Sequence, residues 1–138
     1  KNDFCLIFEL RILFSIFFAI TTQALANKVE LGKYKAIDVE TKQVEAKFTL
    51  NADKTVSNFN IKHPDLTFEG CTGTYEVKGN DLLANMKCPS DKLPVATVTI
   101  DISKVTADGL RSKDGVSVMV SIVELGGDKS EFLLKKND

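Results

Sequence analysis

Apolar and polar residues alternate with a period of two along much of residues 27–138. The segment 44–50 (Val-Glu-Ala-Lys-Phe-Thr-Leu) follows this pattern without a break, and the segments 96–102 and 116–122 repeat it. Successive side chains of a β-strand point to opposite faces, so this period is typical of strands with one buried face. No segment of comparable length has apolar residues at helical spacing. The sequence therefore predicts an all-β domain.

Turn residues divide the alternating chain into eight expected strands. The clearest turn signals are Gly79-Asn80, 113–115 and 126–129, because Gly, Asn and Asp tolerate the backbone conformations of tight turns. Short strands joined by tight turns favour antiparallel pairing, and closure into a barrel removes the exposed sheet edges. The sequence thus predicts an antiparallel, up-and-down β-barrel. The expected strands are 31–38, 43–51, 55–62, 66–78, 81–88, 95–103, 116–125 and 130–136.

Residues 1–26 have the features of a secretory signal peptide. Residues 12–20 form an apolar run after Arg11, and Ala24-Leu-Ala26 matches the small residues that signal peptidase accepts. We expect cleavage after Ala26, leaving 27–138 as one domain, periplasmic or extracellular, with no stable membrane span. An uncleaved span is the alternative, but a nine-residue helix rises only about 14 Å against a hydrocarbon core of about 30 Å.

Two cysteines remain after cleavage. An even number of cysteines in an exported domain favours a disulfide over a catalytic thiol. If Gly79-Asn80 is a two-residue hairpin loop, both cysteines lie on the apolar face of the hairpin and oppose each other. Counting outward from the loop makes them a non-hydrogen-bonded pair, whose short Cα separation suits a disulfide. The predicted apolar-face pairs are Val77 with Leu82, Tyr75 with Ala84, Gly73 with Met86, and Cys71 with Cys88.

The phase of the alternation changes at two places. The residues expected to face inward are even-numbered at Phe68 but odd-numbered at Tyr75. This change predicts a bulge or sharp bend at Gly70. A similar change between Val56 and Phe59 predicts a second break near Asn58. Bends of this kind allow a small sheet to curl into a barrel.

Three short segments carry a family resemblance. They are Gly32-Lys-Tyr34, the stretch Phe48-x-Leu50-x-x-Asp53-Lys-Thr, and Cys71-Thr-Gly-Thr-Tyr75. Together with the spacing of the strands, they resemble the small exported bacterial lipocalin-like (calycin) barrels. The resemblance implies the barrel architecture and, by extension, binding of a small apolar ligand.

Catalytic and metal-binding patterns are missing from the sequence. His63 is the only histidine, and no second histidine or free cysteine completes a zinc site. The sequence has no glycosidase-like carboxylate pair, phosphate-binding glycine loop or nucleophile motif. The formal charge of −1 argues against the basic surface that nucleic-acid binding requires. We therefore expect a protein that is not an enzyme and that has no cofactor, metal or nucleic-acid partner.

Binding is the function class that the sequence favours, and the barrel interior is the first candidate site. Small residues among large ones on the inward phase leave room for a lipid or another small apolar ligand. The alternative is a filled interior, because an eight-stranded barrel is just wide enough to be packed by its own side chains. The candidate ligand-binding residues are Tyr34, Phe48, Phe59, Phe68, Tyr75, Met86 and Phe132.

The outer surface is the second candidate site, for a protein partner. Through it the chain would act as a periplasmic enzyme inhibitor or as an envelope-associated module. A loop at 126–128 would place Ile122 opposite Phe132 and Val120 opposite Leu134 in the last hairpin. The candidate interaction residues are Met119, Val123 and Leu133, which would point outward from this hairpin, and Leu110 and Arg111 in the connection 103–115.

Overall fold

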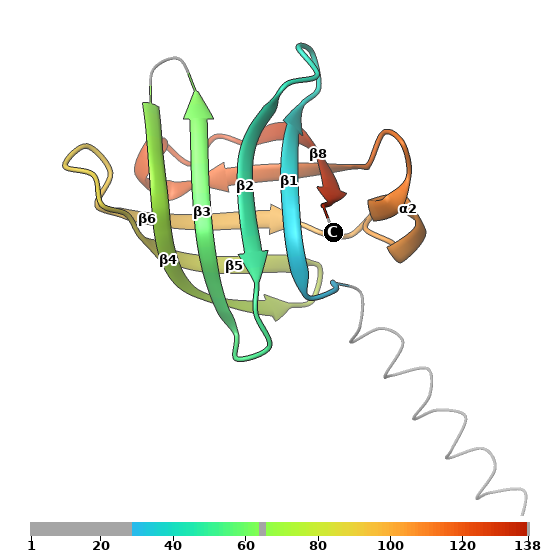
Figure 1. The fold of residues 1–138 in the computed structure, drawn as a ribbon, viewed down its shortest axis with the longest axis horizontal. Coiled ribbons are helices and arrows are strands. Elements are labelled where there is room, and N and C mark those ends of the chain that lie inside the picture. The colour runs from blue at the N-terminus through green and yellow to red at the C-terminus, as the bar shows by residue number, and fades with distance from the viewer. Residues whose placement is uncertain (1–28, 64–65, 138) are drawn as a thin grey trace, which may run out of the picture.

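The computed structural model describes residues 29–63 and 66–137, and the expected signal peptide lies outside these ranges. The described residues form a closed barrel in which each strand pairs antiparallel with the next and β8 pairs with β1 (Figure 1). The predicted up-and-down β-barrel is therefore confirmed. Its elements are β1 (Gly32–Asp38), β2 (Val44–Leu50), β3 (Thr55–His63), β4 (Leu66–Lys78), β5 (Asp81–Lys87), β6 (Val95–Asp101), α2 (Ala107–Arg111), β7 (Val116–Ile122), η1 (Val123–Leu125) and β8 (Ser130–Lys136).

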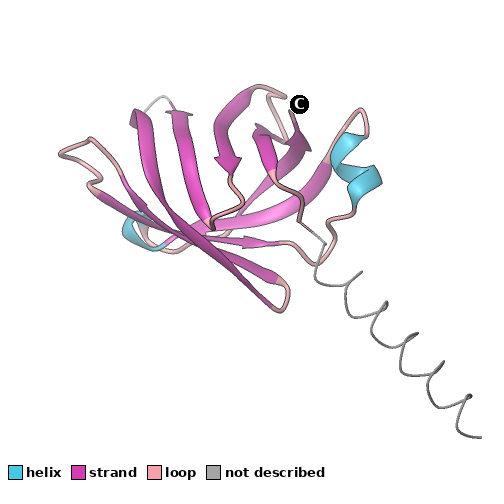
Figure 2. Ribbon diagram, turned by 60° about the horizontal axis from the view of Figure 1, so that its bottom comes forward, coloured by secondary structure: helices cyan, strands magenta, loops and turns pink. Residues whose placement is uncertain are grey.

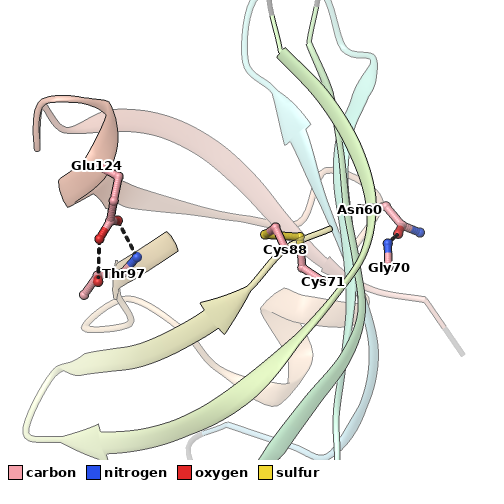
Figure 3. Close-up of a disulfide and its surroundings, with 6 residues drawn as sticks. All are labelled: Asn60, Gly70, Cys71, Cys88, Thr97 and Glu124. Atoms are coloured by element: carbon pink, nitrogen blue, oxygen red, sulfur yellow. Dashed lines mark hydrogen bonds between the residues drawn. A yellow bond between two sulfur atoms is a disulfide. The ribbon is translucent and has the colours of Figure 1, made fainter. Parts of the chain in front are cut away.

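The hairpin of β4 and β5 has the predicted register, and its disulfide is confirmed. Cys71 and Cys88 are bonded, with 4.2 Å between their Cα atoms, as expected for facing residues of a non-hydrogen-bonded pair (Figure 3). Leu93, in the connection to β6, is buried in the same core cluster as the two cysteines. Val77 pairs with Leu82 as predicted, but its side chain is not buried, because it lies next to the turn and is 43% exposed.

Both predicted breaks in the alternation are present. Asn58 adopts a positive φ of 53°, and the register of β2 and β3 shifts between Lys47 and Thr49. Gly70 has a φ of 76°, and its N–H donates to Oδ1 of Asn60 at 2.7 Å (Figure 3). These two bends, one in β3 and one in β4, let the neighbouring strands curl while their apolar side chains continue to face inward.

The last hairpin differs from the prediction. Phe132 pairs with Val118 and not with Ile122, and Leu134 pairs with Val116 and not with Val120. The reason is that β7 ends at Ile122, so the connection is a helical turn followed by glycines rather than a short loop. The shift is an even number of residues, so Phe132 and Leu134 still face the interior.

The connection between β6 and β7 closes one end of the barrel. It contains the helix α2, whose N-cap Thr106 accepts a hydrogen bond from the N–H of Gly109. Three aliphatic side chains of this connection, Ile102, Val105 and Leu110, are at most 2% exposed. Because α2 follows β6 and η1 follows β7, the two helical segments lie at opposite ends of the barrel (Figure 2). We call the end covered by α2 the closed end and the other the open end.

Candidate ligand-binding site

A cavity of about 500 Å³ occupies the barrel interior toward the open end. Its walls come from strands on both sides of the barrel, and its mouth is formed by the ends of β1 and β2 and by the connection between β7 and β8. The lining residues are Ala36, Asp38, Glu45, Ala46, Phe48, Phe59, Ile61, Val98, Ile100, Val118, Val120, Ile122, Leu125, Asp128, Ser130, Glu131, Phe132 and Leu134.

Small side chains explain why this part of the interior is not filled. Ala36 of β1 pairs directly with Ala46 of β2, so two neighbouring strands contribute only methyl groups at the same level of the wall. Ala46 also pairs with Ile61 of β3, which is only partly buried. The result is an apolar space that the chain's own side chains do not occupy.

Aromatic rings form the inner boundary of the cavity. The ring of Phe48 stacks on Tyr34 with 5.3 Å between centroids and an interplanar angle of 8°, and the ring of Phe59 lies 6.2 Å from Phe48. The hydroxyl of Tyr34 donates to the backbone carbonyl of Glu30 at 2.5 Å. Burial raises the pKa of Tyr34 well above its ordinary value, so this phenol stays neutral at physiological pH.

The structure divides the predicted ligand-binding residues into two groups. Phe48, Phe59 and Phe132 line the cavity. The other four predicted residues are buried in the core but are not part of the cavity wall. Those four are Tyr34, Phe68, Tyr75 and Met86.

Sequence reasoning missed part of the cavity wall. Ile61 and Ile122 lie on the inward phase of their strands, so the alternation contained enough information to include them. Leu125 and Asp128 come from the connection after β7, which the expected register treated as strand and short loop. No local pattern places these two residues at the mouth.

The mouth of the cavity is polar and negatively charged. Asp38, Glu45, Asp128 and Glu131 border it, and no Lys or Arg is among the lining residues. The N–H groups of Thr41 and Glu40 donate to the carboxylate of Asp38, at 2.8 Å each, and lower its pKa. Asp38 is therefore charged at neutral pH.

A carboxylate fastens the helical turn η1 to the neighbouring strand at the mouth. Glu124 accepts hydrogen bonds from the backbone N–H of Thr97 at 2.5 Å and from its hydroxyl at 2.9 Å (Figure 3). The ladder between β6 and β7 stops at Val98 and Ile122, so this side chain extends the pairing beyond the last backbone pair. The bond to the Thr97 N–H lowers the pKa of Glu124.

We expect the Glu124 contact to stabilise the fold at pH values above 4.5, the ordinary pKa of this carboxyl. The stabilisation is lost as the pH falls through the lower pKa that Glu124 has in the folded protein. Glu124→Gln removes the titrating group. When the pH is lowered from 6 to 3, the free energy of unfolding of this variant should therefore fall less than that of the wild type. Urea unfolding at several pH values measures this. The exposed Glu69→Gln is the matched control, and an equal change in both variants would contradict the assignment.

The predicted surface residues do not form one continuous site. Met119 is 37% exposed and Val123 is 61% exposed, whereas Leu133 is half-buried on the outer face of β8. The prediction that Leu110 belongs to this outer surface is wrong, because α2 turns its side chain into the closed end, where its exposure is 0%. Arg111 is exposed and forms an ion pair with Glu30 at 2.5 Å.

A second hollow, of about 570 Å³, lies over β3, β4 and β5. The outward-pointing Thr72 and Thr74 border it. It follows the outside of the sheet and does not enter the barrel, so it would leave most of a small ligand in contact with water.

Comparisons of the chain with protein-family models, with curated proteins and with solved structures found no match. Within residues 29–63 and 66–137, no helix is long and apolar enough to cross a membrane. The same residues contain no group of three or more His, Cys, Asp or Glu side chains arranged to hold a metal ion. The fold and cavity thus define a small disulfide-bonded β-barrel with an internal apolar space, and its function is inferred from that space.

Proposed function

We propose that this chain is an exported, lipocalin-like binding protein that takes up a small apolar molecule at the open end of the barrel. One observation carries the proposal: inward-facing apolar side chains border a space that the chain does not fill. Ile61, Val120, Ile122 and Phe132 are only partly buried even though they point into the barrel. A ligand that covers this apolar surface removes it from water, which favours binding.

The size and composition of the cavity support a small ligand. Its volume of about 500 Å³ lies within the range of about 300–1,000 Å³ that is common for small-molecule sites. Apolar walls below a polar mouth suit a molecule with an apolar body, such as an acyl chain or a small ring system, and a polar end that stays near water. Specificity would come from the few polar groups at the mouth.

Export is part of the proposal and rests on two features. The Cys71–Cys88 disulfide is compatible with an oxidising compartment such as the periplasm or the extracellular space. Residues 1–26 have the apolar run and small-residue motif of a signal peptide.

Filling the cavity should abolish binding without unfolding the barrel. In Ala46→Phe the new ring enters the space beside Ala36 and Ile61, and we expect at least about tenfold weaker binding of the neutral fluorescent probe N-phenyl-1-naphthylamine. Thr49→Phe adds the same ring to the outward face of the same strand and is the matched control. Fluorescence titration measures the affinity, and circular dichroism verifies that both variants fold.

Two outcomes would contradict the proposed function. One is that the folded wild type binds no apolar probe. The other is that Ala46→Phe binds the probe as well as Thr49→Phe does, which would place the probe outside the barrel.

A further inference from the structure

Lysines form a row on the outer face of β2, β1 and β8. Lys35 of β1 pairs directly with Lys47 of β2 on one side and with Lys135 of β8 on the other. Lys33 points outward from the same strand as Lys35, on the side of the closed end. Lys33 and Lys47 are exposed, and Lys35 and Lys135 are half-exposed. We call these four residues the basic face.

This arrangement is unfavourable for the barrel alone. Neighbouring strands lie about 4.8 Å apart, and like charges placed directly opposite each other destabilise a sheet. Within the described residues, none of the four lysines forms an ion pair, and the ammonium of Lys135 instead donates to the carbonyl of Lys113 at 2.8 Å. In the described part of the chain, no carboxylate therefore lies within ion-pair distance of the basic face.

Protection of a sheet edge does not explain the row. Lysines on edge strands prevent strands of other molecules from pairing there, but β1 and β8 pair with each other and leave no edge. The charge is also local, since the whole chain has a formal net charge of −1. A cluster of this kind is complementary to an anionic partner.

The surroundings of the basic face favour a lipid surface as that partner. Ile37 and Leu133 pair with each other on the same outer face, one step toward the open end, and both are partly exposed. Single-stranded nucleic acids are usually held by aromatic side chains as well as by basic ones, because their exposed bases stack on rings. The aromatic residues of the described chain all lie inside the barrel: Tyr34, Phe48, Phe59, Phe68, Tyr75 and Phe132.

We propose that the basic face binds the surface of an anionic lipid bilayer. The four ammonium groups contact the phosphate groups, while Ile37 and Leu133 rest against the interfacial region. The interaction is peripheral, because the outer face carries charges and no long apolar stretch. It does not depend on the cavity being occupied, so it stands or fails separately from the proposed function.

The test uses the full chain and its binding to sedimenting vesicles. Each basic residue near an anionic surface contributes roughly fivefold to partitioning, so the charge reversal Lys35→Glu should weaken binding to phosphatidylglycerol-containing vesicles by about 30-fold. Lys87→Glu makes the same change in net charge on β5, which does not neighbour β1, β2 or β8, and should reduce binding far less. Residues 1–26 carry Lys1 and Arg11 against Asp3 and Glu9, so they do not favour anionic over zwitterionic vesicles.

Further outcomes complete the test. Salt should weaken wild-type binding, because the Debye length falls from about 10 Å at 0.1 M to about 3 Å at 1 M. Lys35→Glu should melt no lower than the wild type, since it relieves the repulsion in the row. Equal binding to anionic and phosphatidylcholine vesicles, or equal losses in Lys35→Glu and Lys87→Glu, would overturn the proposal. Binding to duplex DNA in place of vesicles would also overturn it and would indicate a nucleic-acid partner.

Discussion

Removal of the disulfide is expected to lower the free energy of unfolding by about 3 kcal/mol. The bond links residues 17 apart in sequence, so it restricts the unfolded chain by closing a loop. Cys71 has 0% exposure and Cys88 has 8%, so the bond lies within the buried core. The double variant Cys71→Ala/Cys88→Ala, unfolded in urea beside the oxidised wild type, measures the effect.

The double variant also provides the control. A reducing agent should destabilise the wild type to the level of the variant and leave the variant itself unchanged. A difference below about 1 kcal/mol between oxidised and reduced wild type would mean that the denatured chain already keeps these strands together.

Leu110→Ala is expected to destabilise the barrel by about 3 kcal/mol, within the range of 2–5 kcal/mol typical of fully buried leucines. Leu110 is completely buried, and it packs with Ile102 and Val105 at the closed end. Truncation leaves a space that the surrounding strands cannot close, since the barrel fixes their positions. Urea unfolding measures the loss.

Leu31→Ala is the matched control, because Leu31 is 50% exposed. Its effect should stay within about 0.5 kcal/mol. If Leu110→Ala is as mild as Leu31→Ala, then the connection 103–115 does not seal the barrel. The side chain would then be accessible, as the sequence alone predicts.

Features defined by neighbouring residues were predictable. The two-residue loop at Gly79-Asn80 sets the register of β4 and β5, and the alternation then places Cys71 opposite Cys88 on the inner face. The break at Gly70 was visible because a change of phase in the alternation requires an extra residue in the strand. In both cases the signal and its consequence lie within one hairpin.

Features that depend on distant contacts were not predictable. β7 ends at Ile122, and Glu124 just beyond it bonds to Thr97 on another strand, a contact that the local alternation used to extend β7 does not contain. Leu110 is buried because the barrel offers an open end to cover, and not because of a pattern around it. The sequence left a hollow and a filled interior both open, and the pairing of Ala36 with Ala46 in the observed register decides for the hollow one.

The central claim is that the open half of the barrel interior holds an apolar molecule while the closed half is solidly packed. Methyl NMR spectra recorded during a titration with N-phenyl-1-naphthylamine test both parts at once, because the aromatic probe shifts the methyl groups that it touches. We predict saturable shifts at Ile61, Val118, Val120 and Ile122, and none at Ile102, Val105 or Leu110. Shifts confined to outward-facing methyl groups such as those of Val123, or no shifts at all, would contradict the claim.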